Sequence, residues 1–129
     1  MTTQSEIHSW TSGQAKAALS SVNGLLEPLA RLSEELAGAG EILEITSLNG
    51  LIEQRGKMLA NLVGMRTTIH SAIEIAGPNS PEFQYFSELT KKIRISGDIL
   101  VGVLRKRKEV VINNILSTNN QVKLQTYAR

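Results

Sequence analysis

Cysteine is absent from the 129 residues, and histidine occurs only twice, at His8 and His70. Without cysteine the chain can form no disulfide, no thiolate metal site and no cysteine nucleophile. Two histidines far apart in the sequence supply too few ligands for a histidine metal cluster. We therefore expect neither a metal nor a cofactor.

Long apolar runs are missing as well. No run approaches the roughly 18 apolar residues that a membrane-spanning helix needs, so we expect no membrane insertion. The first ten residues, MTTQSEIHSW, lack the basic start and apolar centre of a signal peptide. These two features predict a cytoplasmic protein.

Catalytic motifs are also lacking. The sequence contains no phosphate-binding loop, no dinucleotide fingerprint, no zinc-protease helix and no nucleophile elbow. Its acidic residues are scattered along what we expect to be exposed helix faces, where they are most simply solvated surface charges. The sequence therefore predicts a protein without catalytic residues, which is not an enzyme.

What the chain does have is aliphatic periodicity. Hydrophobic residues make up 41% of the sequence but aromatic residues only 4%, so aliphatic side chains must form the core. The length is that of one domain, spanning residues 1–129. Three segments have helical periodicity, and they are separated at Gly38-Ala39-Gly40 and at Gly77-Pro78-Asn79-Ser80-Pro81.

The first helical segment repeats apolar residues at alternating spacings of three and four, as on one face of a coiled-coil helix. Pro28 interrupts it, and because proline removes one backbone hydrogen bond we expect a kink there rather than the end of the helix. The residues expected on the core face are Ala15, Ala18, Val22, Leu25, Leu29, Leu32 and Leu36.

The second segment keeps the same heptad from Ile45 to Ile73, which predicts one continuous helix. Two of its core-face positions are occupied by arginines, Arg55 and Arg66. Each can lay its methylenes along the core and send its guanidinium outward to an acid of a neighbouring helix. The alternative is a buried contact to a partner.

The third segment opens with a helix start signal, in which Ser80 is the N-cap, Pro81 the first helical residue and Glu82 an acid in the first turn. Its core face follows an eleven-residue repeat that predicts a nearly straight helix of about 40 residues, with Ser96-Gly97-Asp98 as the place where it would break. The predicted fold is all-α: an elongated antiparallel bundle of three long helices with coiled-coil-like packing.

Positive charge is concentrated at the end of the chain, where residues 80–129 contain nine basic and four acidic residues. The run Arg105-Lys106-Arg107-Lys108 covers all sides of a helix and has no aromatic residue nearby for stacking on bases. The pattern therefore favours solvation and ion pairs with the more acidic first two segments over nucleic-acid binding, which stays the third possibility.

A second apolar stripe runs beside each core face. In the second segment it recurs every seven residues, about 100° around the helix from the core face. A wide face for two neighbouring helices explains such a stripe, and so does a groove for a partner helix, for which flexible methionines are well suited. The candidate partner-binding residues are Leu51, Met58 and Met65 in the second segment and Ile95, Ile99, Val103 and Val110 in the third.

Two stretches resemble a known family. LNGLIEQRGKMLANL, following Gly40-Glu41, is similar to the apolar-apolar-Glu-x-Arg-x-x-x-Leu helix of bacterial flagellar type III export chaperones of the FliT and FlgN types. The ending LRKRKEVVINNILSTNNQVKLQTYAR resembles the basic C-terminal helix of the FliT type, with Leu124, Tyr127 and Arg129 at matching positions.

This resemblance implies a cytosolic chaperone that binds an amphipathic helix of a late-exported flagellar subunit and prevents its premature assembly. The implied partners are the filament-cap protein or a hook-filament junction protein, together with export-gate or ATPase components. A structural coiled-coil adaptor or dimerisation module, which would form a homodimer, is the alternative from another functional class.

The C-terminal tail carries one further hypothesis. Residues 117–121 are polar and interrupt the apolar stripe before Val122, Leu124 and Tyr127 restore it. Three apolar side chains gain only a few kcal/mol of burial, so the tail could open at little net cost. We expect it to act as a latch that docks over the partner groove and is displaced by the client.

Overall fold

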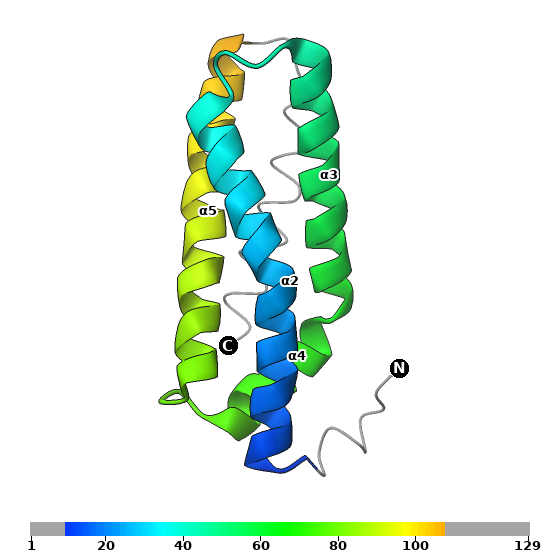
Figure 1. The fold of residues 1–129 in the computed structure, drawn as a ribbon, viewed down its shortest axis with the longest axis vertical. Coiled ribbons are helices and arrows are strands. Elements are labelled where there is room, and N and C mark those ends of the chain that lie inside the picture. Colours follow the sequence, from blue (N-terminus) through cyan, green and yellow to red (C-terminus); the bar gives the residue numbers. More distant parts are fainter. Residues whose placement is uncertain (1–9, 108–129) are drawn as a thin grey trace.

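The computed structural model describes residues 10–107, which form four α-helices and no strand. These are α2 (Ser12–Ala39), α3 (Ile45–Gly64), α4 (Arg66–Ala76) and α5 (Pro81–Arg107). In Figure 1, α2 and α5 run upward, α3 runs downward and the short α4 lies across the lower end. The all-helical, elongated up-down-up arrangement is confirmed, but the number of helices is not: the described part has four rather than three.

Helix α2 begins at a reciprocal cap. The Thr11 hydroxyl accepts from the backbone N–H of Gln14, while the Gln14 side chain accepts from the N–H of Thr11. The helix continues through Pro28, as predicted, and ends at Ala39. Its core face differs in detail from the prediction, because Leu19 and Leu26 are buried whereas Leu25 is 50% exposed. The buried face of α2 is therefore shifted around the helix relative to the predicted one, so that Leu26 takes the place of Leu25 in the core.

The second predicted helix is wrong as a single element, because it divides at Met65 into α3 and α4. Met65 leaves helical geometry, with φ −98° and ψ 7°, and its N–H donates to the carbonyls of Leu62 and Val63. The break turns α4 across the bundle, so that its buried residues Ile69 and Ala72 join the lower core cluster with α2.

Helix α5 starts as predicted: the hydroxyl of Ser80 accepts from the N–H of Phe83, and Pro81 is the first helical residue. The preceding Gly77 has φ 88°, a conformation that suits glycine. The helix passes through residues 96–98 without a break, and both Ser96 and Gly97 are buried. Continuation of this helix to about residue 122 lies outside the described residues.

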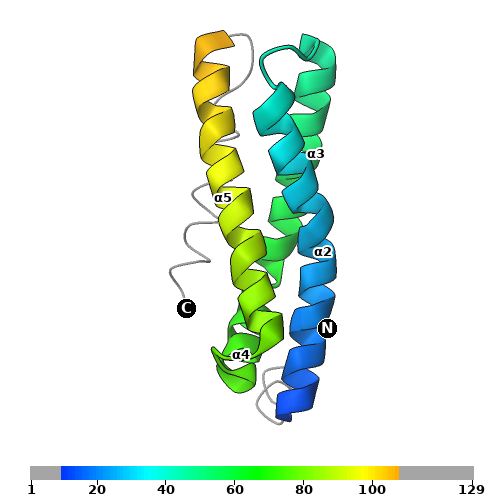
Figure 2. The same cartoon turned by 60° about the vertical axis from the view of Figure 1, so that its left-hand side comes forward.

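Three contacts align α2 and α5 side by side in the same direction, as the two views in Figures 1 and 2 show. At the lower end the Asn23 amide donates to the Glu82 carbonyl at 3.0 Å. One turn higher, desolvation and then the neighbouring Glu27 carboxylate raise the pKa of the Tyr85 phenol. At the upper end Arg107 reaches the chain just after α2.

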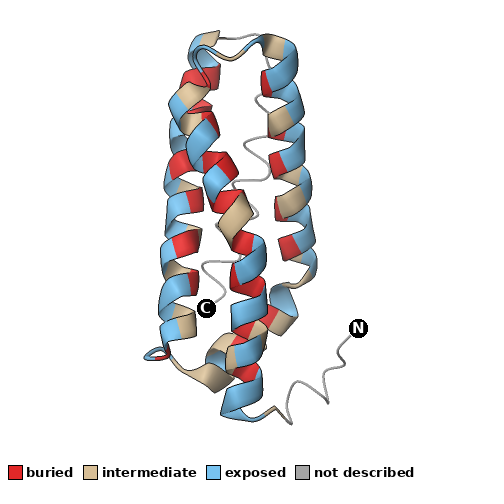
Figure 3. Ribbon diagram, viewed as in Figure 1, coloured by how far each residue is buried: buried red, intermediate tan, exposed pale blue. Residues whose placement is uncertain are grey.

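The core lies between the helices in two aliphatic clusters, visible as the inward-facing buried positions in Figure 3. The lower cluster joins α2, α4 and the first half of α5 with the end of α3, and Phe83 and Phe86 stack at its edge with ring centroids 6.4 Å apart. The upper cluster joins the end of α2, the start of α3 and the second half of α5. The two clusters meet at the level of Arg55.

Arg55 corrects the expectation for the core-face arginines. Its guanidinium does not point outward to an acid, because the residue is fully buried, at 0% exposure. Its Nε donates to the Ser33 hydroxyl of α2 at 3.0 Å, and Nη2 lies 3.5 Å from the Ile93 carbonyl of α5. Arg66, at the start of α4, is exposed. The same heptad pattern therefore includes both a buried and a solvated arginine, because the chain turns at Met65 between them.

Candidate functional site

The three candidate residues of the second segment form a row at the edge of the core. Leu51 and Met58 lie on α3 and Met65 at the α3–α4 junction, and all three are half-buried. Leu51 packs against the upper cluster, Met65 against the lower one, and Met58 against both. Each side chain is thus fixed by the core on one side while keeping part of its apolar surface open to solvent. We call this set the α3 row.

The candidate residues of α5 do not join this row. Ile95 and Ile99 are 46% and 51% exposed and pack in neither core cluster. In the upper cluster α5 contributes Leu100, Val101 and Leu104, which are buried together with Leu48 and Ile52 of α3. Because residues two apart differ by about 200° around a helix, Ile99 lies on the side of α5 opposite Val101. The structure therefore places Ile95 and Ile99 away from the α3 row, on the outer face of α5.

Val103 is not part of an open surface. It is 9% exposed, and a Cβ added to Gly40 would lie 3.3 Å from its methyl group. Val103 therefore packs on the end of α2, where glycine allows close approach. Val110 and the latch residues Val122, Leu124 and Tyr127 lie outside the described residues.

Buried charge is concentrated at Arg55. Desolvation lowers its pKa to about 10, and the Asp98 carboxylate opposes that shift. The guanidinium is still charged at neutral pH, so the bundle holds a cation between its two apolar clusters. Arg55 contacts the Ser33 hydroxyl of α2 and the Ile93 carbonyl of α5, which gives it an internal structural role at the meeting point of three helices.

The basic run at the end of α5 is partly used within the fold. Arg107 Nη1 donates to the carbonyls of Gly40 at 2.8 Å and Leu43 at 2.7 Å, the loop between α2 and α3. A cation at the end of α2 also suits the negative end of the helix dipole. Arg105 and Lys106 are exposed, and Lys108 lies outside the described residues. One of the four basic side chains is therefore engaged by the backbone rather than presented to phosphates.

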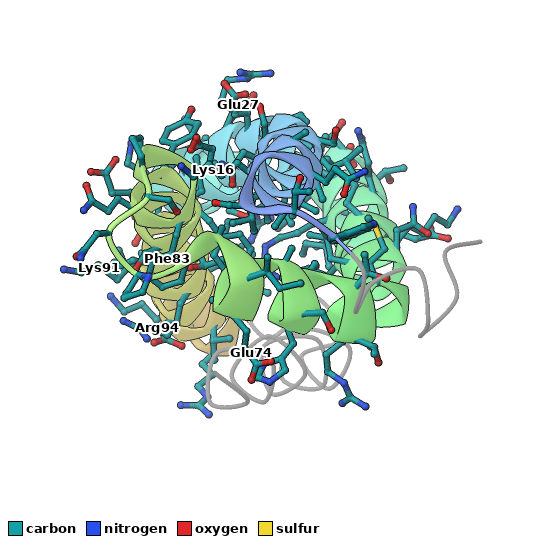
Figure 4. The ribbon with its side chains drawn as sticks, turned by 90° about the horizontal axis from the view of Figure 1, so that it is seen from below. Lys16, Glu27, Glu74, Phe83, Lys91 and Arg94 are labelled. Carbon is teal, nitrogen blue, oxygen red and sulfur yellow. The ribbon has the colours of Figure 1, made fainter. Side chains whose placement is uncertain are left out.

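Charged side chains elsewhere project from the outside of the bundle, as Glu74, Lys91 and Arg94 do in the view from below in Figure 4. His70 lies 3.3 Å from Glu74 one turn away, and both side chains are substantially exposed. Within residues 10–107, no group of three or more histidine or acidic side chains is placed to hold a metal ion. None of the helices in that range has the length and apolar character needed to cross a membrane.

Comparison with known proteins identifies no relative of this chain. The chain matches no family model, no curated protein and no solved structure. A functional interpretation therefore depends on the geometry of this chain and on the sequence resemblance described above.

Proposed function

We propose that this protein is a cytosolic flagellar export chaperone, which binds an amphipathic helix of a late-exported subunit along the α3 row. The client would be the filament-cap protein or a hook-filament junction protein, handed on to export-gate or ATPase components. The single observation that carries the proposal is the α3 row itself, a line of half-buried apolar side chains two turns apart on a helix with the family-like sequence.

The spacing of the row suits a helical client. Leu51, Met58 and Met65 follow one another at seven-residue intervals, about 10 Å apart along the helix axis. A client helix that presents apolar residues at the same interval can meet all three, while methionine side chains adapt to its shape. If each contact covers about 40 Å² of apolar surface, the row contributes about 3 kcal/mol before ordering costs, so further contacts must supplement it.

The core contacts of the α3 row would keep its side chains in place when no client is bound. Met58 touches both clusters, so its position is set by the fold and not by the partner. A preorganised surface loses less side-chain entropy when it binds. The client helix, in contrast, would order on binding, which fits a chaperone for a subunit that must remain unassembled.

The test is binding of the filament-cap protein of the same organism to the full chain. Replacing Met58 with Glu puts a charge beneath the apolar face of the client, and we expect at least about tenfold weaker binding. Replacing Ala60 with Glu is the matched control, because Ala60 is exposed on the same helix and lies about 200° from Met58. Met58→Leu keeps the apolar contact and should bind nearly as well as the natural chain.

Stability measurements distinguish a binding role from a packing role. Met58→Glu should remain helical by far-ultraviolet circular dichroism and unfold in one cooperative transition, because Met58 lies at the edge of the core and is not fully buried. If Met58→Leu binds normally while Met58→Glu and Ala60→Glu lose binding equally, the row is not the client surface. A gene neighbourhood without motility genes would count against the flagellar role independently.

A structural coiled-coil adaptor or dimerisation module is the second candidate function, and the exposed Ile95 and Ile99 favour it. These residues are separate from the α3 row, so both roles can exist in one chain. Nucleic-acid binding is less supported, since Arg107 is bound to the backbone after α2. Retention on nucleic acid with a steep salt dependence would argue for it.

A further inference from the structure

The outer face of α5 carries a heptad stripe that takes no part in either core cluster of residues 10–107. Its spacing alternates between four and three residues, as in a coiled-coil seam, and every member is exposed. The core of the bundle is formed by other positions of the same helix, among them Ile93, Leu100 and Leu104. We call this set the α5 stripe: Glu88, Lys92, Ile95, Ile99, Gly102 and Lys106.

The α5 stripe is symmetric about Gly97. Ile95 and Ile99 lie two positions on either side of it, Lys92 and Gly102 five, and Glu88 and Lys106 nine. Two copies of α5 packed antiparallel about a twofold axis at Gly97 would therefore place Ile95 against Ile99, Lys92 against Gly102 and Glu88 against Lys106. We propose that the α5 stripe binds a second copy of this chain in this antiparallel arrangement.

The charges of the α5 stripe favour a second copy of this chain as the partner, and they favour antiparallel over parallel packing. In the antiparallel pair each end of the stripe joins a carboxylate with an ammonium group, and the twofold axis repeats the match at the other end. A parallel pair would instead put Lys92 against Lys92 and Lys106 against Lys106, which is repulsive. A self-complementary surface is what an isologous dimer requires, and the match between charges is present in the sequence of α5 itself.

Gly102 contributes space to the same interface. Among residues 10–107, a Cβ built on it meets nothing within 4 Å, so no side chain of this range covers it. In the antiparallel pair the four-carbon stem of the second copy's lysine at position 92 lies over this glycine and can extend its ammonium group to solvent. Ile95 and Ile99 of the two copies then form an apolar centre, which is flanked at each end by a pair of Lys92 and Gly102.

The dimer is expected to be weak. The stripe spans about 27 Å of helix and its apolar part is four isoleucines in all, which is less than the roughly 800 Å² per partner of a standard interface. Asp98 lies beside the twofold axis and approaches its own copy, which further limits affinity. We expect a dissociation constant of about 10–1000 µM, so the dimer forms at high local concentration.

The test is sedimentation equilibrium of the full chain at low salt, up to about 1 mM. We expect a shift from the 14.1 kDa monomer toward twice that mass. Ile99→Glu should remove it, whereas Ile42→Glu, at an 86% exposed position in the loop after α2, should not. Both changes leave the core intact, because neither side chain packs in a core cluster.

Charge exchange tests the direction of packing. Glu88→Lys and Lys106→Glu should each raise the dissociation constant by roughly tenfold, because each replaces two attractive pairs with two repulsive ones. The double variant restores opposite charges in the antiparallel pair and should return to the original affinity. A monomer at all concentrations, an Ile99→Glu variant that still dimerises, or a double variant no tighter than the singles would each overturn the proposal. None of these readouts involves a client protein.

Discussion

Replacing the buried Arg55 with methionine should leave the bundle as stable as before or more stable. The guanidinium is fully buried, and the lowering of its pKa to about 10 corresponds to about 3 kcal/mol against the charged form. Methionine is shorter and uncharged, so it fills only the inner part of this space but does not carry that cost. It gives up the hydrogen bond from Nε to the Ser33 hydroxyl at 3.0 Å, and the contact from Nη2 to the Ile93 carbonyl, which at 3.5 Å is weak.

The balance of these terms sets the expected magnitude. A hydrogen bond to a charged group is worth about 1.5–3 kcal/mol, which is no larger than the cost removed. We therefore expect Arg55→Met to change the free energy of unfolding by between zero and about +2 kcal/mol. Arg55→Ala leaves a cavity between the two clusters as well and should lose about 3 kcal/mol.

The assay is urea unfolding followed by circular dichroism at pH 7 for the natural chain and both variants. At this pH the desolvation cost is fully present: the folded pKa is lower than the unfolded one, so the cost is relieved only as the pH rises above about 10. If Arg55→Met were destabilised as much as Arg55→Ala, the charged side chain would be stabilising the bundle, and the reasoning from desolvation would be refuted.

Three further changes test single contacts. Hydrogen bonds from the backbone at the start of α3 are the main cause of the lowered Glu44 pKa. The free energy of unfolding should therefore fall as the pH drops below about 4.5. Glu44→Gln should weaken this pH dependence, as measured by the urea midpoints at pH 7 and pH 3. Arg107→Met removes the hydrogen bonds to the Gly40 and Leu43 carbonyls and should lower the unfolding free energy by about 1.5–3 kcal/mol in urea titrations. Lys106→Met, at the exposed neighbouring position, is the control and should change it by less than about 0.5 kcal/mol. Asn23→Ala frees the Glu82 carbonyl at the lower end of the α2–α5 contact, and a loss of about 1–2 kcal/mol is expected by thermal unfolding; no loss would mean that solvent replaces this bond.

Periodicity predicted the helices well because it reports which side of each helix is buried. The start of α5 could be predicted equally well from the sequence, because Ser80 and Pro81 form a local helix-start signal that needs no tertiary information. The division at Met65 gave no such signal. The heptad continues through it to Ile69 and Ile73, and only the packing of α4 across α2 requires the chain to turn there.

The candidate site shows the same limit. A stripe beside the core face can be found from the sequence, and Met58 and Ile99 were both found in this way. The sequence of one helix does not say which neighbour lies on which side. Residues of α3 and α5 were therefore grouped, although Ile99 packs in neither core cluster. Likewise Arg55 was placed on the core face correctly, but the Ser33 hydroxyl that accepts from its Nε lies 22 residues away.

The most direct test of the proposed chaperone function is calorimetric titration of the full chain with the filament-cap protein of the same organism. The account predicts saturable binding that Met58→Glu weakens at least about tenfold and that Ala60→Glu leaves unchanged. Absence of binding to the filament-cap and junction proteins, or equal binding by the Met58→Glu variant, would contradict it.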